Sequence, residues 1–290
     1  MSPDNRSSGS IIPNIAPGFY VEYRRDGVSS HFDFDVSDGV ATITLNRPDK
    51  LNALTFEAYA DLRDLIPQLP NRGDARVLVI TGDGRGFCSG GDVEEIIGEL
   101  VKREAAELRE FTRMTGAVVK GLRELPMPVI AAVNGVAAGA GSVIALAADF
   151  RLLGESASFA FLFTRVGLSG ADMGSAYLLP RIVGLGRATE LLMLGDRIDA
   201  NRALEIGLAN EVVPDDELRE RVAKLARRLA DGPALAYSAT KAALIRELDS
   251  DLGTSIEMEA LTQALLMKSE DFNEFYNAWH EGRKPDWRGR

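Results

Sequence analysis

The run PVIAAVNGVAAGAGSVIALAAD, at residues 128–149, constrains the fold more than any other part of the chain. Residues 129–133 are uniformly apolar, which predicts a buried strand, and an apolar helix is expected from about Ser142. Between them, residues 134–141 are mostly Gly and Ala, and such small residues let the backbone approach a ligand closely. A helix N-terminus leaves N–H groups unpaired and carries a partial positive charge. The turn is therefore expected to face a phosphate or an oxyanion.

The rest of the chain alternates strand and helix patterns up to about residue 214, which is typical of an α/β protein with crossover connections. Residues 82–91 are expected to form a glycine-rich loop and residues 92–124 a largely helical segment. A further helix is predicted over 55–69, with Thr55 as its cap. Three helical segments without an intervening strand follow from about Asp215. The predicted strands are 40–45, 76–81, 129–133, 150–153 and 157–161.

Composition and charge exclude several kinds of function. The 290 residues carry a net charge of −10, which disfavours binding to nucleic acid. The two histidines, His31 and His280, are too few for a multi-histidine metal site and argue against most Ser-His-Asp hydrolases. No uninterrupted apolar stretch reaches the length of a membrane span, and the polar start lacks a secretory signal. With Cys88 as the single cysteine, we expect a cytoplasmic protein that binds no metal, nucleic acid or membrane.

Two loops, at residues 80–92 and 133–143, carry the chemistry, since each follows an apolar strand and precedes a helix. The first is not a dinucleotide-binding fingerprint, because its third glycine comes one residue early, and neither a P-loop nor a G-x-S-x-G elbow occurs. What remains is a pair of backbone N–H donors directed at one point. Two such donors on a thioester carbonyl would stabilise the enolate formed when a proton leaves the α-carbon, and the loss of one typically costs ~3 kcal/mol.

Five segments together resemble the enoyl-CoA hydratase/isomerase (crotonase) superfamily and occur in the order typical of it. They are LNRPDKLNAL (45–54), GFCSGGD (86–92), PVIAAVNGVAAGAG (128–141), LLPRIVGLGRATELLMLGDRIDANRALEIGLANEVVP (178–214) and SEDFNEFYNAWHEGRKP (269–285). Residues 1–29 are rich in Ser, Pro, Asn and Gly and are expected to form a flexible N-terminal arm. The resemblance implies an α/β fold, with a crotonase-like spiral of ββα units at 30–214 and a C-terminal helical trimerisation region at 215–290. It also implies an acyl-CoA substrate, a homotrimer or a hexamer built as a dimer of trimers, and no permanently bound cofactor, since coenzyme A arrives with the substrate.

By motif, the resemblance assigns the two oxyanion donors to the backbone N–H groups of Ser89 and Ala140. Many members of the family have Gly at the second position. An alanine fits there only if its φ is negative, so Gly141 is the alternative donor.

The same resemblance places the coenzyme A contacts in the first loop, the oxyanion loop and the tail. Arg47 could bind a phosphate and give the acidic protein a local basic lip, or it could form an ion pair instead. Asp92 is expected among the contacts, although it is also well placed as a helix N-cap. From the tail, Phe272, Phe275 and Lys284 would complete the pocket of a neighbouring subunit, unless the two phenylalanines only pack their helix. The remaining predicted contacts are Lys50, Leu51, Ala53 and Gly91.

The chain departs from the family where typical hydratases carry two glutamates that activate water. Those positions fall on Val143 and Phe163, and an apolar pair cannot hold a water for addition to a double bond. Asp172 is the best replacement, because a carboxylate in an apolar pocket would have a raised pKa and could move a proton between carbons. It could instead cap the helix that follows. Ser142 and Thr164 are weaker polar candidates.

The resemblance favours the name enoyl-CoA hydratase, whereas the residues favour isomerisation or another one-acid reaction through Asp172. Two alternatives stay open. Hydrolysis or decarboxylation of an acyl-CoA would also need only the oxyanion donors and one further group. A member of the family that binds acyl-CoA without turnover would account for Val143 and Phe163 equally well.

Overall fold

The computed structural model describes residues 31–289, and its larger sheet is mostly parallel. Its six strands lie in the order β1 (Phe32–Ser37), β2 (Val40–Leu45), β3 (Val77–Gly82), β5 (Val129–Val133), β7 (Phe150–Gly154) and β10 (Glu211–Val213). Only the β1–β2 pair is antiparallel. The strand predicted at 40–45 is confirmed residue for residue, because its alternating pattern points every second side chain into the core. The arm predicted at 1–29 lies outside the described residues.

A second, smaller sheet runs through the loop expected at 82–91 and the turn expected at 134–141, and it includes the strand predicted at 157–161. It consists of β4 (Gly86–Cys88), β6 (Val136–Ala138), β8 (Ser158–Ala160) and β9 (Ile198–Asp199), with only β9 antiparallel to its neighbour. The predictions of a loop at 82–91 and a turn at 134–141 were therefore incomplete, since strands of three residues rich in Gly and Ala show no period. Three times over, a strand of the first sheet is followed by one of the second sheet and then by helix, which is the predicted ββα spiral.

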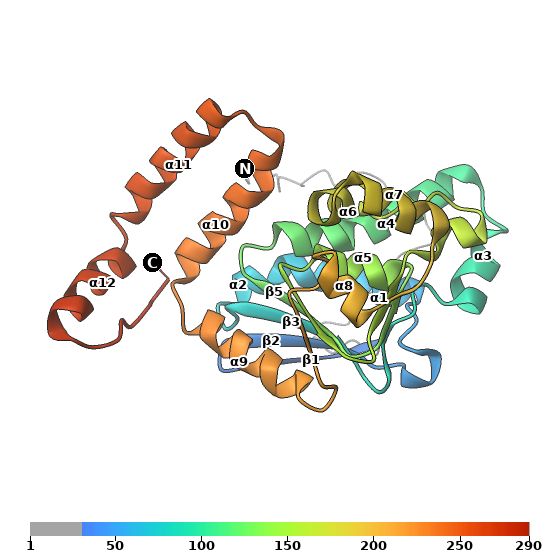
Figure 1. Ribbon diagram of the computed structural model, residues 1–290, viewed down its shortest axis with the longest axis horizontal. Coiled ribbons are helices and arrows are strands. Elements are labelled where there is room, and N and C mark those ends of the chain that lie inside the picture. The colour runs from blue at the N-terminus through green and yellow to red at the C-terminus, as the bar shows by residue number, and fades with distance from the viewer. Residues whose placement is uncertain (1–30, 290) are drawn as a thin grey trace, which may run out of the picture.

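Helices cover both faces of the larger sheet (Figure 1). On one face lie α1 (Phe56–Leu65), α4 (Ala105–Glu124) and α5 (Ala140–Ala147), packed on inward side chains such as Leu78 and Ile80. On the other face α9 (Leu218–Ala230) covers Val77 and Val79. Because α9 packs on the sheet, it joins the core structurally although it follows the predicted boundary at residue 214. The other helices before α9 are α2 (Leu69–Arg72), α3 (Gly98–Leu100), α6 (Ser175–Val183), α7 (Leu185–Leu194) and α8 (Ala200–Glu205).

The segment 92–124 is helical in three pieces rather than one. A π-helical turn at Val93–Ile97 runs into α3, and the chain then breaks before α4 begins. The break is set by a capping box at the start of α4, in which Glu104 and Glu107 exchange backbone and side-chain hydrogen bonds.

Beyond α9, three helices extend away from the sheets: α10 (Ala234–Arg246), α11 (Leu252–Leu266) and α12 (Glu270–Glu281) (Figure 1). The last predicted helical segment is thus divided in two, because Ser269 accepts a hydrogen bond from Phe272 N–H and starts α12. Lys241 of α10 anchors this region, with its Nζ 2.7 Å from Asp149 Oδ2 and in side-chain hydrogen bonds to carbonyls of the core. In the part of the chain that the structure describes, no helix combines the length and apolarity needed to cross a membrane.

Candidate active site

The N-terminus of α5 presents backbone donors without a side-chain cap. Gly139 precedes the helix at φ +50°, a conformation that favours glycine, and no side chain caps the helix. Ala140 follows with a negative φ, so the condition for an alanine at this position is met. The first hydrogen bond of the helix runs from Val143 N–H to Gly139 O, at 3.3 Å. The N–H of Ala140, at the first helical position, is therefore left for another acceptor.

The predicted donor Ser89 is engaged within the protein. Its N–H donates to Leu51 O at 2.9 Å, and its hydroxyl donates to Lys50 O at 3.1 Å. A thioester oxygen could use the Ser89 N–H only by displacing the Leu51 carbonyl. The structure thus departs from the expectation that this N–H is free, because Leu51 turns its backbone toward it from a left-handed conformation with φ +50°.

Gly91, two residues further along, has the geometry that was expected of Ser89. It forms a parallel bridge with Leu54, in which Leu54 donates to Gly90 O and accepts from Asp92 N–H. In such a bridge the N–H and C=O of Gly91 itself point to the opposite side. Within residues 31–289 the N–H of Gly91 has no hydrogen-bond partner.

The glycine loop and the start of α5 are in direct contact. A Cβ added to Gly90, which has φ +102°, would lie 3.5 Å from the backbone nitrogen of Ala140. A Cβ on Gly141 would lie only 2.1 Å from Cys88 O. These contacts require glycine at both positions, because any side chain would separate the loop from the helix.

The two positions that carry glutamate in typical hydratases lie in the apolar interior. Val143 is fully buried, and Phe163 is 8% exposed. Ser142 cannot replace them, because its hydroxyl donates to the carbonyls of Ala137 and Ala160 and so ties α5 to the smaller sheet. The Thr164 hydroxyl is buried and makes no hydrogen bond to any described residue.

Asp172 lies half-buried in the loop before α6 and is not the cap of that helix. The N-cap is Gly174, which has no capping side chain. Asp172 Oδ1 instead accepts a hydrogen bond from Met173 N–H at 2.9 Å. Burial raises the pKa of the Asp172 carboxyl above its ordinary value, against the smaller opposing effect of this hydrogen bond. The capping alternative is therefore not met, and a role for Asp172 in proton transfer stays a prediction.

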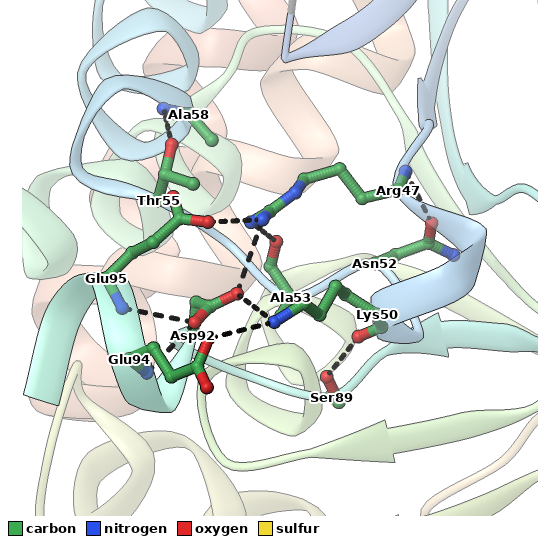
Figure 2. A network of polar contacts seen from close by, with 10 residues as sticks. All are labelled: Arg47, Lys50, Asn52, Ala53, Thr55, Ala58, Ser89, Asp92, Glu94 and Glu95. Carbon is green, nitrogen blue, oxygen red and sulfur yellow. Dashed lines mark hydrogen bonds and ion pairs between the residues drawn. The ribbon is translucent and has the colours of Figure 1, made fainter.

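The expected basic lip is a network of ion pairs (Figure 2). Arg47 donates to Glu95 at 2.6 Å, to Asp92 at 3.3 Å and to Ala53 O at 3.0 Å. Lys50 lies 3.4 Å from Glu94 and 3.9 Å from Asp92. Two cations thus meet three carboxylates, so the lip is not basic, and Arg47 follows the ion-pair alternative.

The predicted capping role of Asp92 is confirmed. Its Oδ1 accepts from Glu94 N–H at 3.0 Å and from Glu95 N–H at 3.1 Å. The hydrogen bond from Glu95, followed by that from Glu94 and by the nearby cations, holds the pKa of Asp92 below its ordinary value. Asp92 is only 2% exposed, so it reaches a ligand only if the loop moves.

The residues predicted from the tail do not lie near the other site residues of their own chain. Phe272 and Phe275 are about half exposed on α12, and Lys284 follows that helix on the surface. Figure 1 places α12 at the left end of the molecule, away from α5 in the α/β core. Their expected contribution to a neighbouring subunit stays a prediction.

Tyr59 was not singled out from the sequence, although it belongs to this region. It lies one turn into α1, is 2% exposed, and has Cys88 and Asp172 as the ionisable groups that act on its hydroxyl. Its helical spacing predicts a core residue. The one available signal is that a buried position of this helix carries tyrosine, whose hydroxyl needs a polar partner, where leucine would fill the core without one.

The spiral of ββα units, with a glycine loop pressed against a helix N-terminus, defines an enzyme of the crotonase class. The chain belongs to the enoyl-CoA hydratase/isomerase family, whose sequence profile matches residues 35–290. It is 38% identical to a probable enoyl-CoA hydratase of Rhodobacter capsulatus, over 89% of this chain and 97% of that protein. It is 36% identical to the 1,2-epoxyphenylacetyl-CoA isomerase of Escherichia coli K12, over 88% of this chain and 97% of that protein. A solved structure of a candidate enoyl-CoA hydratase from Streptomyces coelicolor A3(2) superposes with a TM-score of 0.90 at 58% identity, covering 95% of this chain and all of that one.

Proposed function

We propose that the protein is an acyl-CoA isomerase that moves a carbon–carbon double bond through a thioester enolate. The Asp172 carboxylate would take a proton from the α-carbon of a 3-enoyl-CoA. The electron pair would pass to the thioester oxygen, and the proton would return at the γ-carbon to give the 2-enoyl-CoA. The observation that carries this proposal is the half-buried carboxylate of Asp172 together with apolar side chains at both glutamate positions, Val143 and Phe163.

The N–H groups of Ala140 and Gly91 would hold the thioester oxygen, with Gly91 replacing Ser89 in this role. The free N–H of Gly91 and the contact between Gly90 and the backbone nitrogen of Ala140 support this pairing. The partial positive charge at the N-terminus of α5 would add to the stabilisation of the enolate. Each donor of this kind is worth ~3 kcal/mol in the transition state.

The relatives leave hydration as the second candidate reaction. One relative is named a probable enoyl-CoA hydratase, and another is named an isomerase of an acyl-CoA. Hydration needs a group that orients and deprotonates water, and the buried Val143 and Phe163 supply none. Isomerisation needs a single carboxylate, which the chain has.

The substrate would be a coenzyme A thioester, which the family name supports. Arg47 and Lys50 would bind phosphate by giving up carboxylate partners, and the backbone around Leu51 and Ala53 would line the entrance. The protein would act in the cytoplasm without a permanently bound cofactor.

We further propose a homotrimer, or a hexamer of two trimers, assembled through α11 and α12. These helices expose large apolar side chains that a monomer would leave in water, including Leu252, Leu261, Leu265 and Trp279. Phe272 and Lys284 would then reach the pocket of a neighbouring subunit.

The test compares 3-enoyl-, 2-enoyl- and 3-hydroxyacyl-CoA as substrates of the wild type and of Asp172→Asn. Asparagine can still accept the hydrogen bond from Met173, so the loop is expected to persist. The conversion of 3-enoyl- to 2-enoyl-CoA should fall by roughly 10²- to 10⁴-fold, because the proton carrier is lost. The exposed Asp216→Asn is the matched control and should leave the rate unchanged. Strong hydration that survives Asp172→Asn would refute the proposal.

A further inference from the structure

The loop before α6 holds Asp172 in a turn that its own residues do not favour. Ser175 N–H donates to Asp172 O at 2.9 Å and closes a four-residue turn over 172–175. Both central residues have a positive φ, +50° at Met173 and +90° at Gly174, as in a type I′ turn. A left-handed φ is unfavourable for a residue with a side chain, such as Met173. The turn must therefore be held by further contacts.

The hydroxyl of Ser175 supplies contacts of this kind. It donates to Gly170 O at 2.6 Å and accepts from Asp172 N–H at 3.1 Å. The side chain is fully buried, so water does not compete for these two hydrogen bonds. The hydroxyl does not cap α6, whose N-cap is Gly174 without a side-chain hydrogen bond. Its two bonds instead tie the backbone of Gly170 to the backbone of Asp172.

The other end of this connection lies against a helix of the core. A Cβ added to Gly170 would lie 2.2 Å from Leu192 O, so the backbone of Gly170 is pressed against α7. Helix α7 contacts α6, and α6 contacts α5, whose N-terminus presents the N–H of Ala140. Direct contacts thus join the turn of Asp172 to the element that would hold the thioester oxygen.

The Asp172 carboxylate is held at one oxygen and open at the other. Its Oδ1 accepts from Met173 N–H at 2.9 Å, within the same turn. No residue among 31–289 donates a hydrogen bond to Oδ2 or forms an ion pair with the carboxylate. The direction of the open oxygen is therefore set by the backbone of the turn, and through that backbone by Ser175.

We propose that Ser175 is a positioning residue, whose hydroxyl fixes the turn of Asp172 against α7 and so keeps the open carboxylate oxygen where it can take the α-proton. Ser175 is buried and acts only through Asp172, without contact to the substrate. A displacement of a reacting group by about 1 Å can cost ~10²-fold in rate. The inference rests on the proposed function, because it takes Asp172 as the group that moves the proton.

The experiment is a double-mutant cycle on the isomerisation of 3-enoyl-CoA by the full-length wild type, Ser175→Ala, Asp172→Asn and the double variant. Without the hydroxyl, Gly170 O and Asp172 N–H lose their partner, and kcat should fall by roughly 10- to 10²-fold. The Kd of hexanoyl-CoA should stay unchanged, because the donors at Gly91 and Ala140 keep their contacts. In the Asp172→Asn background the further loss in kcat should be less than about 2-fold, since no proton carrier is left to position.

Two further variants separate positioning from stability. Ile130→Val removes a methylene group from a fully buried position on the α9 side of the larger sheet, and should destabilise the protein without changing kcat. Ser175→Cys fills the same space with a weak donor, and should lower kcat by less than Ser175→Ala does. Thermal unfolding shows which variants are folded, and Ser175→Cys takes the place of Ser175→Ala in the cycle if the alanine variant does not fold.

The outcomes separate this proposal from the proposed function. If Asp172→Asn slows the reaction but Ser175→Ala leaves kcat unchanged, the positioning role is refuted and Asp172 keeps its role. The same holds if Ser175→Ala slows the Asp172→Asn variant as much as it slows the wild type, or if it weakens hexanoyl-CoA binding as much as it lowers kcat. If Asp172→Asn isomerises 3-enoyl-CoA at the wild-type rate, the proposed function fails and the role of Ser175 fails with it.

Discussion

The substitution Gly141→Ala should slow the reaction, because the added Cβ would clash with the backbone of the glycine loop. The added Cβ would lie 2.1 Å from Cys88 O and 2.7 Å from Cys88 Cβ. An ordinary carbon–oxygen contact needs about 3.3 Å, so the glycine loop and the start of α5 must separate by about 1 Å. A misplacement of about 1 Å can cost ~10²-fold in rate. Because both partners are backbone or core atoms, the overpacking should also cost about 1–3 kcal/mol of stability.

The assay follows exchange of the α-protons of a saturated acyl-CoA with deuterated water by NMR. This exchange needs only enolate formation, so it reports on the two donors whatever the full reaction is. Gly116→Ala is the matched control, since Gly116 is also in a helix but has nothing within 4 Å of an added Cβ. The control should keep its rate and gain roughly 0.5–1 kcal/mol. If Gly141→Ala exchanges the α-protons as fast as the wild type and is equally stable, the glycine loop and α5 do not meet as described and the reasoning fails.

Two further predictions concern charged groups. The raised pKa of Asp172 means that the folded state binds its proton more tightly than the unfolded state does. The free energy of unfolding contributed by Asp172 therefore falls as the pH rises from the ordinary carboxyl pKa through the raised one, and the reaction rate rises over the same interval because the base ionises. In Asp172→Asn both pH dependences should vanish. If they persist in melting curves and in kinetics measured against pH, the assignment is contradicted. Lys241→Met should cost about 3–5 kcal/mol in urea unfolding, because Asp149 loses its 2.7 Å partner in a buried setting. The exposed Lys120→Met should cost almost nothing, and equal losses in the two variants would refute this account.

Much of the larger sheet can be predicted from the sequence because its strands carry regular patterns. The alternation in β2 and the apolar run of β5 each specify a strand by themselves. The smaller sheet cannot be predicted in this way, since β4 and β6 have three residues each and consist mainly of small residues. Their strand geometry comes from pairing with neighbouring strands rather than from their own propensity.

The site was predictable in its location but not in its hydrogen bonds. The motifs identified the two loops, and Asp92 was foreseen as a cap from its place before a helix. The proposed donor is Gly91 rather than Ser89, because Leu51 O accepts the Ser89 N–H. Such a long-range backbone hydrogen bond cannot be recognised from the sequence. For Arg47 the sequence left a phosphate contact and an ion pair open, because its carboxylate partners Asp92 and Glu95 lie far along the chain.

The bridge between Leu54 and Gly91, with the contact of Gly90 on Ala140, has a consequence for folding. Three segments distant in sequence build the site, so the donors come together only through long-range contacts. Each contact closes a long loop, and the entropy of closure must be overcome before the donors converge. An acyl thioester would accordingly recognise only the completed fold and would stabilise it by mass action. Ligand binding would thus report on the last stage of folding as well as on the reaction.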